Sequence, residues 1–208
     1  MQPNWDERYR QGDTPWDKGS ASPALIAWLQ ENPGLMNGSV LIPGCGTGHD
    51  VRAIASAEPK SFPLGIDISQ TAIRECRQKK VVGHERYEEE NLFSLPKELL
   101  GTCDWLWEHT CFCAIDPSKR SAYVSAVAAC LKPGGSLLGI FYLNPRRNDS
   151  RPDNGPPHGT TIEELESLFL GDGVFSMEKT MAPSTCYPER EGREHLLLLR
   201  RTRKGNDS

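Results

Sequence analysis

The chain has 208 residues, of which 37% are hydrophobic and 25% are charged, and its formal net charge is −4. This composition is typical of a water-soluble domain and excludes a disordered or membrane-embedded chain. The longest apolar runs are too short to cross a bilayer, and the polar, acidic start is unlike a secretory signal peptide. We expect a single domain over residues 1–208 that works in the cytoplasm as a monomer or weak homo-oligomer, without nucleic-acid or membrane partners.

Strand-like and helix-like segments alternate along the chain. Such alternation predicts an α/β fold in which a mainly parallel sheet has helices on both faces. Ser69 and Pro117 are typical helix-start residues. Residues 144–159 are rich in Pro, Gly, Asn and Asp and predict a long loop. The expected strands are 39–43, 62–67, 103–108, 136–143, 174–181 and 195–201, and the expected helices are 22–32, 50–58, 69–80, 117–131 and 161–170.

A glycine-rich turn follows the first expected strand, with Gly44, Gly46 and Gly48 in "PGCGTG". Glycine lets the backbone turn tightly and lets a ligand approach its N–H groups at the carboxyl end of the strand. Asp67 ends the next strand, where an acidic residue binds ribose hydroxyls in nucleotide-binding units. The pattern G-x-G-x-x-G fails because His49 stands at the third glycine position. A nucleoside without a pyrophosphate therefore fits better than a dinucleotide.

The seven cysteines are scattered, odd in number and without a C-x-x-C pair. Reduced thiols fit this pattern better than disulfides or a metal site, and we expect no bound metal. Cys111 and Cys113 flank Phe112, and we expect them to be small, buried and inert side chains rather than nucleophiles.

Several segments, in order and spacing, are similar to one enzyme family. "WDERYRQGDTPWDKGSASP", "PGCGTGHDV", "CFCAIDPSKR", "NGPPHG" and "GREHLLLL" resemble the thiopurine S-methyltransferase superfamily, and most of all its plant-type branch that methylates thiols, thiocyanate and halides. The resemblance covers essentially the whole chain. It implies a Rossmann-like class I methyltransferase with a mainly parallel seven-stranded sheet, which uses S-adenosyl-L-methionine and releases S-adenosyl-L-homocysteine.

The resemblance also implies which residues hold the cofactor. An aromatic face attracts a sulfonium cation, which supports a role for the tryptophans of the N-terminal arm, residues 1–23. Asn91 stands where an aspartate is commoner, so its amide oxygen would accept from the exocyclic amine of adenine. The residues assigned to the cofactor in this way are Trp5, Tyr9, Trp16, Gly44, Gly46, Asp67, Ile68, Asn91, Leu92, Glu108 and His109.

The substrate side departs from the family pattern. Glu108 and His109 stand where Asp-Tyr is usual, and His158 stands where a tyrosine is usual, so two imidazoles replace two phenols. We take His109 and His158 as candidate catalytic residues, with His109 as the base for a thiol and Glu108 bound either to the cofactor's amino group or to the His109 ring. The arm 1–23 and the substrate-side loop 144–159 would close over the site and exclude water.

The sequence thus predicts methyl transfer to a small thiol, sulfide or similar soft nucleophile. The alternatives within enzymes are a halide or thiocyanate methyltransferase and a thiopurine-type or selenium methyltransferase. A catalytically silent protein that binds S-adenosylmethionine is the alternative from another class, although it leaves the "FCAI" and "GPPH" segments without a purpose.

Overall fold

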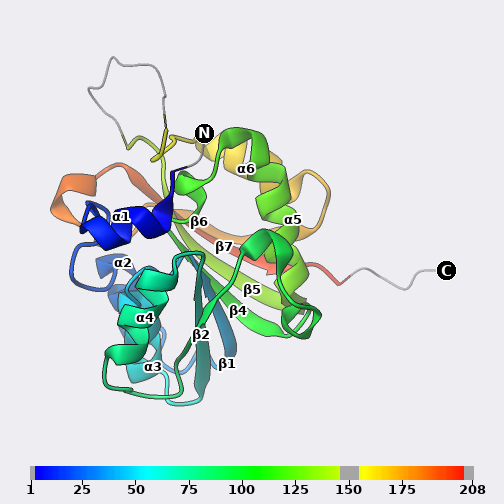
Figure 1. The fold of residues 1–208 in the computed structure, drawn as a ribbon. Helices are drawn as coiled ribbons and strands as arrows, with labels where there is room; N and C mark the ends of the chain where they lie inside the picture. Colours follow the sequence, from blue (N-terminus) through cyan, green and yellow to red (C-terminus); the bar gives the residue numbers. More distant parts are fainter. Residues whose placement is uncertain (1–2, 146–154, 204–208) are drawn as a thin grey trace.

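The computed structural model describes residues 3–145 and 155–203 and forms a seven-stranded sheet in the order β3-β2-β1-β4-β5-β7-β6 (Figure 1). The expected substrate-side loop is described only at its two ends, since residues 146–154 lie outside the described residues. The strands are β1 (Gly38–Pro43), β2 (Ser61–Asp67), β3 (Arg86–Glu89), β4 (Cys103–His109), β5 (Leu131–Tyr142), β6 (Phe175–Met181) and β7 (Glu194–Arg201). The helices are α1 (Trp5–Gln11), α2 (Pro23–Glu31), α3 (His49–Ala57), α4 (Gln70–Gln78), α5 (Arg120–Cys130) and α6 (Ile162–Leu170).

The pairing of the strands confirms the mainly parallel sheet. β1 pairs in parallel with β2 on one side and with β4 on the other. β2 pairs in parallel with β3, and β4 pairs in parallel with β5. β7 runs antiparallel between β5 and β6. The strand order reverses direction between β1 and β4, and open α/β sheets bind ligands beside the carboxyl ends of the strands at such a reversal.

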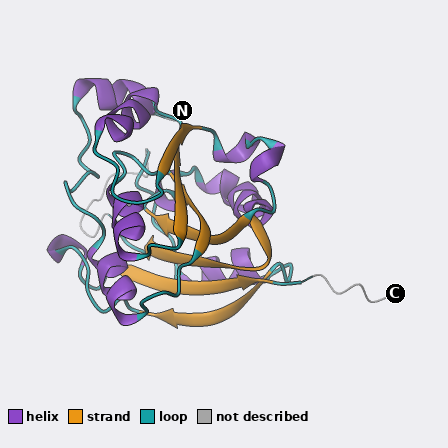
Figure 2. Cartoon of the chain, turned by 90° about the horizontal axis from the view of Figure 1, so that it is seen from below, coloured by secondary structure: helices purple, strands orange, loops and turns teal. Residues whose placement is uncertain are grey.

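Alternate residues of each central strand enter two different hydrophobic cores. In β4, Trp105 and Trp107 pack on the face covered by α2, α3 and α4, whereas Leu106 packs on the face covered by α5 and α6. This follows from the two-residue repeat of a strand, which sends neighbouring side chains to opposite faces. The helices lie on both sides of the sheet, as expected (Figure 2). Within the described residues, no helix is long and apolar enough to cross a membrane.

Two elements were not expected from the sequence. β3 is a four-residue strand at the edge of the sheet, and α1 is a seven-residue helix in the N-terminal arm. The α1 helix has ordinary end signals, because the Asn4 side chain accepts from Glu7 N and Gly12 ends the helix with φ of 68°. Ser69 caps α4 as expected by accepting from Ala72 N.

The stretch expected as one helix over 117–131 is divided. A 3₁₀ turn, Pro117–Lys119, precedes α5, and Asp116 caps that turn by accepting from Ser118 N. β5 then begins at Leu131, five residues earlier than expected, directly after α5 ends at Cys130. The side chains of Cys130 and Leu131 are both fully buried. The run of apolar residues in the sequence therefore continues from the helix into the strand and does not show where one ends and the other begins.

Candidate active site

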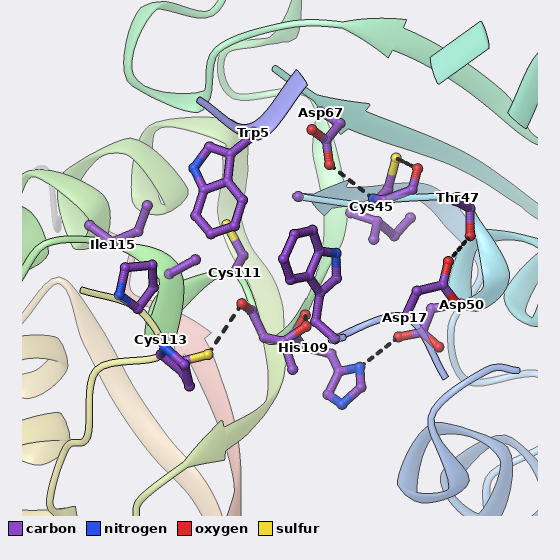
Figure 3. A pocket seen from close by; sticks show the side chains of 18 of the residues that line it. Trp5, Asp17, Cys45, Thr47, Asp50, Asp67, His109, Cys111, Cys113 and Ile115 are labelled. Carbon is purple, nitrogen blue, oxygen red and sulfur yellow. Dashed lines mark hydrogen bonds and ion pairs between the residues drawn. The ribbon is translucent and has the colours of Figure 1, made fainter. Parts of the chain in front are cut away.

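A cavity of about 570 Å³ lies at the carboxyl ends of β1, β2 and β4. The α1 helix and the chain that leads from it to α2 form one side of this cavity, and the segment that precedes β7 contributes to its wall as well. Figure 3 shows Trp5 projecting into the cavity, with Asp67 and Cys45 on one side and Cys113 and Ile115 on the other. The cavity thus occupies the position that the strand order predicts for a ligand.

The glycine turn after β1 forms part of the floor of the cavity. Gly44, Gly46 and Gly48 all have positive φ, of 61°, 53° and 81°. A Cβ atom on Gly46 would lie 2.8 Å from the Tyr9 hydroxyl, and one on Gly48 would lie 2.7 Å from the Tyr87 ring. Side chains here would be strained by the backbone conformation and blocked by these rings, which explains the glycines physically.

Asp67 ties this turn to the end of β2. Its Oδ2 accepts from Gly46 N at 3.0 Å, and its Oδ1 accepts from Ser69 N at 2.9 Å. Burial raises the pKa of Asp67 even though these backbone N–H groups favour the carboxylate. Each oxygen keeps further acceptor capacity toward the cavity that the residue lines.

Three aromatic residues of the arm line the cavity together. The indole Nε1 of Trp16 donates to the hydroxyl of Tyr9 at 3.0 Å, and the ring of Trp5 meets that of Trp16 edge to face at a centroid distance of 5.2 Å. The guanidinium of Arg8 lies 4.3 Å from the Trp16 ring centroid, so this indole already attracts a cation.

Two carboxylates hold the arm against the ends of two helices. Asp6 accepts from Thr71 N at 2.8 Å and from Ser69 Oγ at 2.9 Å, at the start of α4. Asp17 accepts from Thr47 Oγ1 at 2.7 Å and lies 3.2 Å from Nε2 of His49, at the start of α3. The arm is therefore anchored on either side of Tyr9 and Trp16.

Apolar side chains line the cavity beyond Asp67. Ile68 is 51% exposed and Phe93 is 39% exposed, although both are large apolar residues, and Leu92 is buried beside them. Asn91 Oδ1 accepts from Phe93 N at 3.0 Å and caps the short turn that follows. This part of the cavity is suited to a flat, mostly apolar ring with polar edges.

The imidazole of His109 lies between two charged groups at the end of β4. Its Nδ1 is 3.1 Å from Oδ2 of Asp50, and both residues are labelled in Figure 3. Its Nε2 is 3.3 Å from Nη1 of Arg190. Arg190 is buried and donates to Glu194 Oε1 at 3.0 Å. Its guanidinium also lies 5.3 Å from the ring centroid of Tyr187, a ring that stacks on His109.

The structure corrects two expected site residues. Glu108 does not line the cavity, because it precedes His109 in a strand and faces the opposite side of the sheet, where Phe112 N and the Tyr123 hydroxyl bind its carboxylate. Burial raises the pKa of Glu108 to about 7. His158 does not line the cavity either, and its backbone N donates to Cys113 O at 2.7 Å. The residues before it, Pro156 and Pro157, do line it.

Two cysteines lie at the cavity as thiols. Cys111 and Cys113 line it, and burial raises the pKa of both, that of Cys113 to about 12. All seven cysteines are free. The expectation that this pair is unreactive agrees with these surroundings, because the thiolate is the nucleophilic form.

The remaining expected residues come together at the cavity, and sequence reasoning missed three others. Asp50 and Arg190 hold His109, and Asp17 anchors the arm. Asp50 and Asp17 carried a signal in the motifs "PGCGTGHDV" and "TPWDKG", whereas Arg190 ends a short 3₁₀ turn, Pro188–Arg190, that no motif marks. The expected residues that line the cavity are Trp5, Tyr9, Trp16, Gly44, Gly46, Asp67, Ile68, Asn91, Leu92 and His109.

The surroundings of the cavity fit S-adenosylmethionine. A carboxylate for sugar hydroxyls, exposed apolar side chains for a base and an aromatic pair for a sulfonium are present in one cavity. At Gly44 and Gly46, which both line the cavity, the turn presents backbone and no side chain to a ligand. When bound, the cofactor supplies a methyl group activated by its attachment to a positively charged sulfur.

Comparison with known structures supports the fold. A structure from work on the conversion of a disulfide bond into a thioacetal group during echinomycin biosynthesis aligns with a TM-score of 0.77, at 20% identity, over 97% of this chain and 92% of that one. The 1,6-didemethyltoxoflavin N1-methyltransferase of Burkholderia thailandensis, bound to S-adenosylhomocysteine, aligns with a TM-score of 0.70 at 16% identity. The alignment covers 95% of this chain and 85% of that one. At these identities, the likeness concerns the Rossmann-like methyltransferase fold.

Comparison of sequences gives the family. Thiocyanate methyltransferase 1 of Brassica oleracea is 32% identical, and the probable thiol methyltransferase 2 of Arabidopsis thaliana is 34% identical, each over 92% of this chain and 82% of the relative. A thiopurine S-methyltransferase of Legionella pneumophila is 25% identical over 77% of both chains. The family model of thiopurine S-methyltransferase matches residues 1–196. The chain therefore belongs to the thiopurine S-methyltransferase family and is an S-adenosylmethionine-dependent methyltransferase.

Proposed function

We propose that this enzyme methylates a small thiol or hydrosulfide. The observation that carries the proposal is the pairing of His109 with Arg190 in the wall of the cavity, because this pair offers a proton acceptor and a positive charge at one place. A thiol must lose its proton to become a good nucleophile, and a nearby cation favours the resulting thiolate. The thiol and thiocyanate methyltransferases among the relatives support an acceptor of this kind.

The residues around the cofactor have binding and shielding roles in this proposal. Asp67 accepts from the ribose hydroxyls, and the glycine turn lets the amino-acid end approach the backbone closely. Trp5 and Trp16 present aromatic faces to the sulfonium. With the arm anchored through Asp17, these rings exclude water from the reacting atoms and hold them in line.

On the acceptor side, His109 takes the thiol proton on Nε2 and Arg190 stabilises the thiolate. The contact between Nε2 and Arg190 Nη1, at 3.3 Å, is longer than the usual hydrogen bond, whereas Arg190 keeps a 3.0 Å bond to Glu194. An incoming acceptor can therefore replace the weaker contact while the arginine stays paired.

A halide or thiocyanate acceptor is the second candidate, favoured by the buried guanidinium of Arg190 and by the named plant relatives. Such anions carry no proton to remove, so they require the arginine but not the histidine. A thiopurine-type acceptor, as in the names of the less similar relatives, would also need room for a larger ring. A selenium compound is a further alternative. A silent cofactor-binding protein would transfer no methyl group at all.

Methyl transfer from labelled S-adenosylmethionine to separate acceptors tests the proposal. The panel contains hydrosulfide, a small alkyl thiol, thiocyanate, iodide and an aromatic thiopurine, each assayed with the wild type and with His109→Gln. We expect the small thiols to give the highest kcat/KM and to lose most of it in the variant, while thiocyanate and iodide change little. Higher turnover of thiocyanate or iodide than of any thiol contradicts the proposal and favours the second candidate.

We also propose that the enzyme acts in the cytoplasm on free small molecules. The seven free cysteines support a reducing compartment, since oxidising compartments favour disulfides. Measurement of the intact mass of the protein isolated from its own cells under alkylating conditions checks this proposal. All seven thiols should be alkylated in denaturant without prior reduction, and a thiol that stays unmodified contradicts the proposal.

A further inference from the structure

Asp50 has a place in this site that neither the family resemblance nor the relatives assign. It lies in the first turn of α3, directly after the glycine turn, and lines the cavity. Its Oδ1 accepts from Ser22 N at 2.7 Å, while its Oδ2 accepts from Trp107 Nε1 at 2.8 Å and lies 3.1 Å from His109 Nδ1. Donors from Ser22, just before α2, and from Trp107 and His109 in β4 thus fix this carboxylate in one orientation.

The charge on Asp50 is maintained despite burial. Burial alone would raise the pKa of Asp50, but the hydrogen bonds from His109, Ser22 and Trp107 outweigh it and hold the pKa below its usual range. Its position at the N-terminus of a helix acts in the same direction. Asp50 is therefore an acceptor, and Nδ1 of His109 must be the donor in their contact.

The other ring nitrogen of His109 is constrained independently. A guanidinium has N–H donors and no acceptor, so Nε2 of His109 must accept in its contact with Arg190 Nη1. Only a neutral ring with its proton on Nδ1 satisfies both neighbours. The opposite tautomer would point a lone pair at the Asp50 carboxylate and an N–H at the guanidinium.

We propose that Asp50 is a positioning residue that keeps the proton of His109 on Nδ1 and thereby leaves Nε2 free to accept a proton from the methyl acceptor. This inference rests on the proposed thiol methylation. When the thiol S–H bond breaks, its proton forms a bond to Nε2 and its electron pair stays on sulfur. The resulting imidazolium then lies against the Asp50 carboxylate, which stabilises it.

The groups around the His109 ring suit both its neutral and its protonated state. The charged or titratable groups that face His109 are Asp50 from α3, Glu194 from β7, and Arg190 and Tyr187 from the segment before β7. Glu194 Oε1 is 3.9 Å from Nε2, so a second carboxylate is in place once Nε2 carries a proton. The positive charge of Arg190 disfavours a proton on Nε2. When the ring is charged, Arg190 still has Glu194 as a hydrogen-bond partner.

The test measures the tautomer of His109 directly and does not depend on activity. The protein is labelled with heavy nitrogen in its histidines, and NMR at mildly alkaline pH distinguishes a protonated from an unprotonated ring nitrogen. The spectrum of His109→Gln identifies the signals of this residue. We expect the wild type to hold the proton on Nδ1, and we expect Asp50→Asn to raise the fraction of rings protonated on Nε2, because the longer contact with Arg190 then sets the tautomer without the carboxylate.

Kinetic measurements with a matched control complete the experiment. Asp50→Asn should lower kcat/KM for a small thiol by at least about 100-fold, by analogy with the effect of such a change behind other catalytic histidines. It should change kcat/KM for thiocyanate, which carries no proton, by less than about threefold. Asp104→Asn is the control, because it also removes a carboxylate that accepts from a backbone N–H but lies at the opposite end of β4. It should leave the tautomer and both activities unchanged.

The outcomes separate the inference from the proposed function. An unchanged tautomer in Asp50→Asn, or equal losses for thiol and thiocyanate, overturns the positioning role. If the wild type methylates no thiol, the proposed function fails and the catalytic part of the inference fails with it, while the NMR result still decides whether Asp50 sets the ring proton. If Asp50→Asn does not fold, a wild-type ring protonated on Nε2 overturns the inference and one protonated on Nδ1 supports it.

Discussion

The hydroxyl of Tyr9 accepts a hydrogen bond from the indole of Trp16 and lies against the glycine turn, where a Cβ on Gly46 would be 2.8 Å away. The arm therefore contacts the cofactor-binding turn through a phenol that the indole holds in place. Because burial raises the pKa of Tyr9, this phenol stays neutral.

Two substitutions of Trp16 should weaken cofactor binding to different extents. Trp16→Phe keeps an aromatic face but loses the bond to Tyr9, and we expect about fivefold weaker binding of S-adenosylmethionine. Trp16→Ala loses both and should weaken it by about 30-fold. Titration calorimetry measures both affinities, and Trp28→Phe, on α2 and outside the cavity lining, is the matched control. Equal affinities for the wild type and Trp16→Ala contradict the role of the aromatic arm.

Asp67→Asn should reduce the affinity for S-adenosylhomocysteine. The amide keeps the size of the side chain but removes the charge that strengthens its hydrogen bonds, so we expect a loss of about 1.5–3 kcal/mol in binding free energy. The measurement is titration calorimetry, with the melting temperature as a check on folding. An intact variant that binds as tightly as the wild type removes Asp67 from the site.

Asp17→Asn should speed the release of S-adenosylhomocysteine. The substitution weakens the contacts to Thr47 and His49 that anchor the arm, so opening becomes easier. We expect a roughly three- to tenfold faster dissociation rate by stopped-flow tryptophan fluorescence, with little change in association. Asp172→Asn, in the exposed turn after α6, is the control and should match the wild type. A rate unchanged in Asp17→Asn shows that the arm does not limit release.

Glu108 should make the protein less stable as the pH rises. Its pKa of about 7 in the folded chain is above its ordinary value of 4.5, so the folded state binds the proton more tightly than the unfolded state. Its contribution is fully present at acidic pH and is lost as the pH rises toward 7, by on the order of 3 kcal/mol at most. Glu108→Gln mimics the protonated form and should flatten this part of the stability profile.

Chemical denaturation at several pH values between about 5 and about 8 measures this effect. As the pH rises, the unfolding free energy of the wild type should fall relative to that of Glu108→Gln. A difference that does not depend on pH contradicts a protonated carboxyl at this position. Tyr123→Phe should change the same profile, because the Tyr123 hydroxyl binds the Glu108 carboxylate.

Most of the sheet was predictable because buried strands leave continuous apolar runs between helices with their own start signals. β3 was missed because three of its four residues are charged and only Tyr87 is buried. Four residues are too few to establish a repeat. The α1 helix was missed although Asn4 and Gly12 mark its ends, because its aromatic residues face the cavity and leave no ordinary core stripe.

The site was predictable where a short motif brings its residues together, as in the glycine turn. Asp50 and Arg190 lie 59 and 81 residues from His109 in the sequence, and only the tertiary fold makes them neighbours. The error at Glu108 was avoidable, since two adjacent residues of a strand cannot both face the same side of a sheet. Once His109 is placed in the cavity, Glu108 belongs to the opposite core.

The pleat of β4 makes the length of this strand as important as its composition. Pairing with β1 fixes Trp105 opposite Val40, and pairing with β5 fixes His109 opposite Ile140. A slip of one residue past these neighbours would send an imidazole into an apolar core and a carboxylate into the cavity. A substitution at the end of β4 therefore leaves every other side chain of the strand on its own face, whereas one residue gained or lost would exchange the faces of Glu108 and His109.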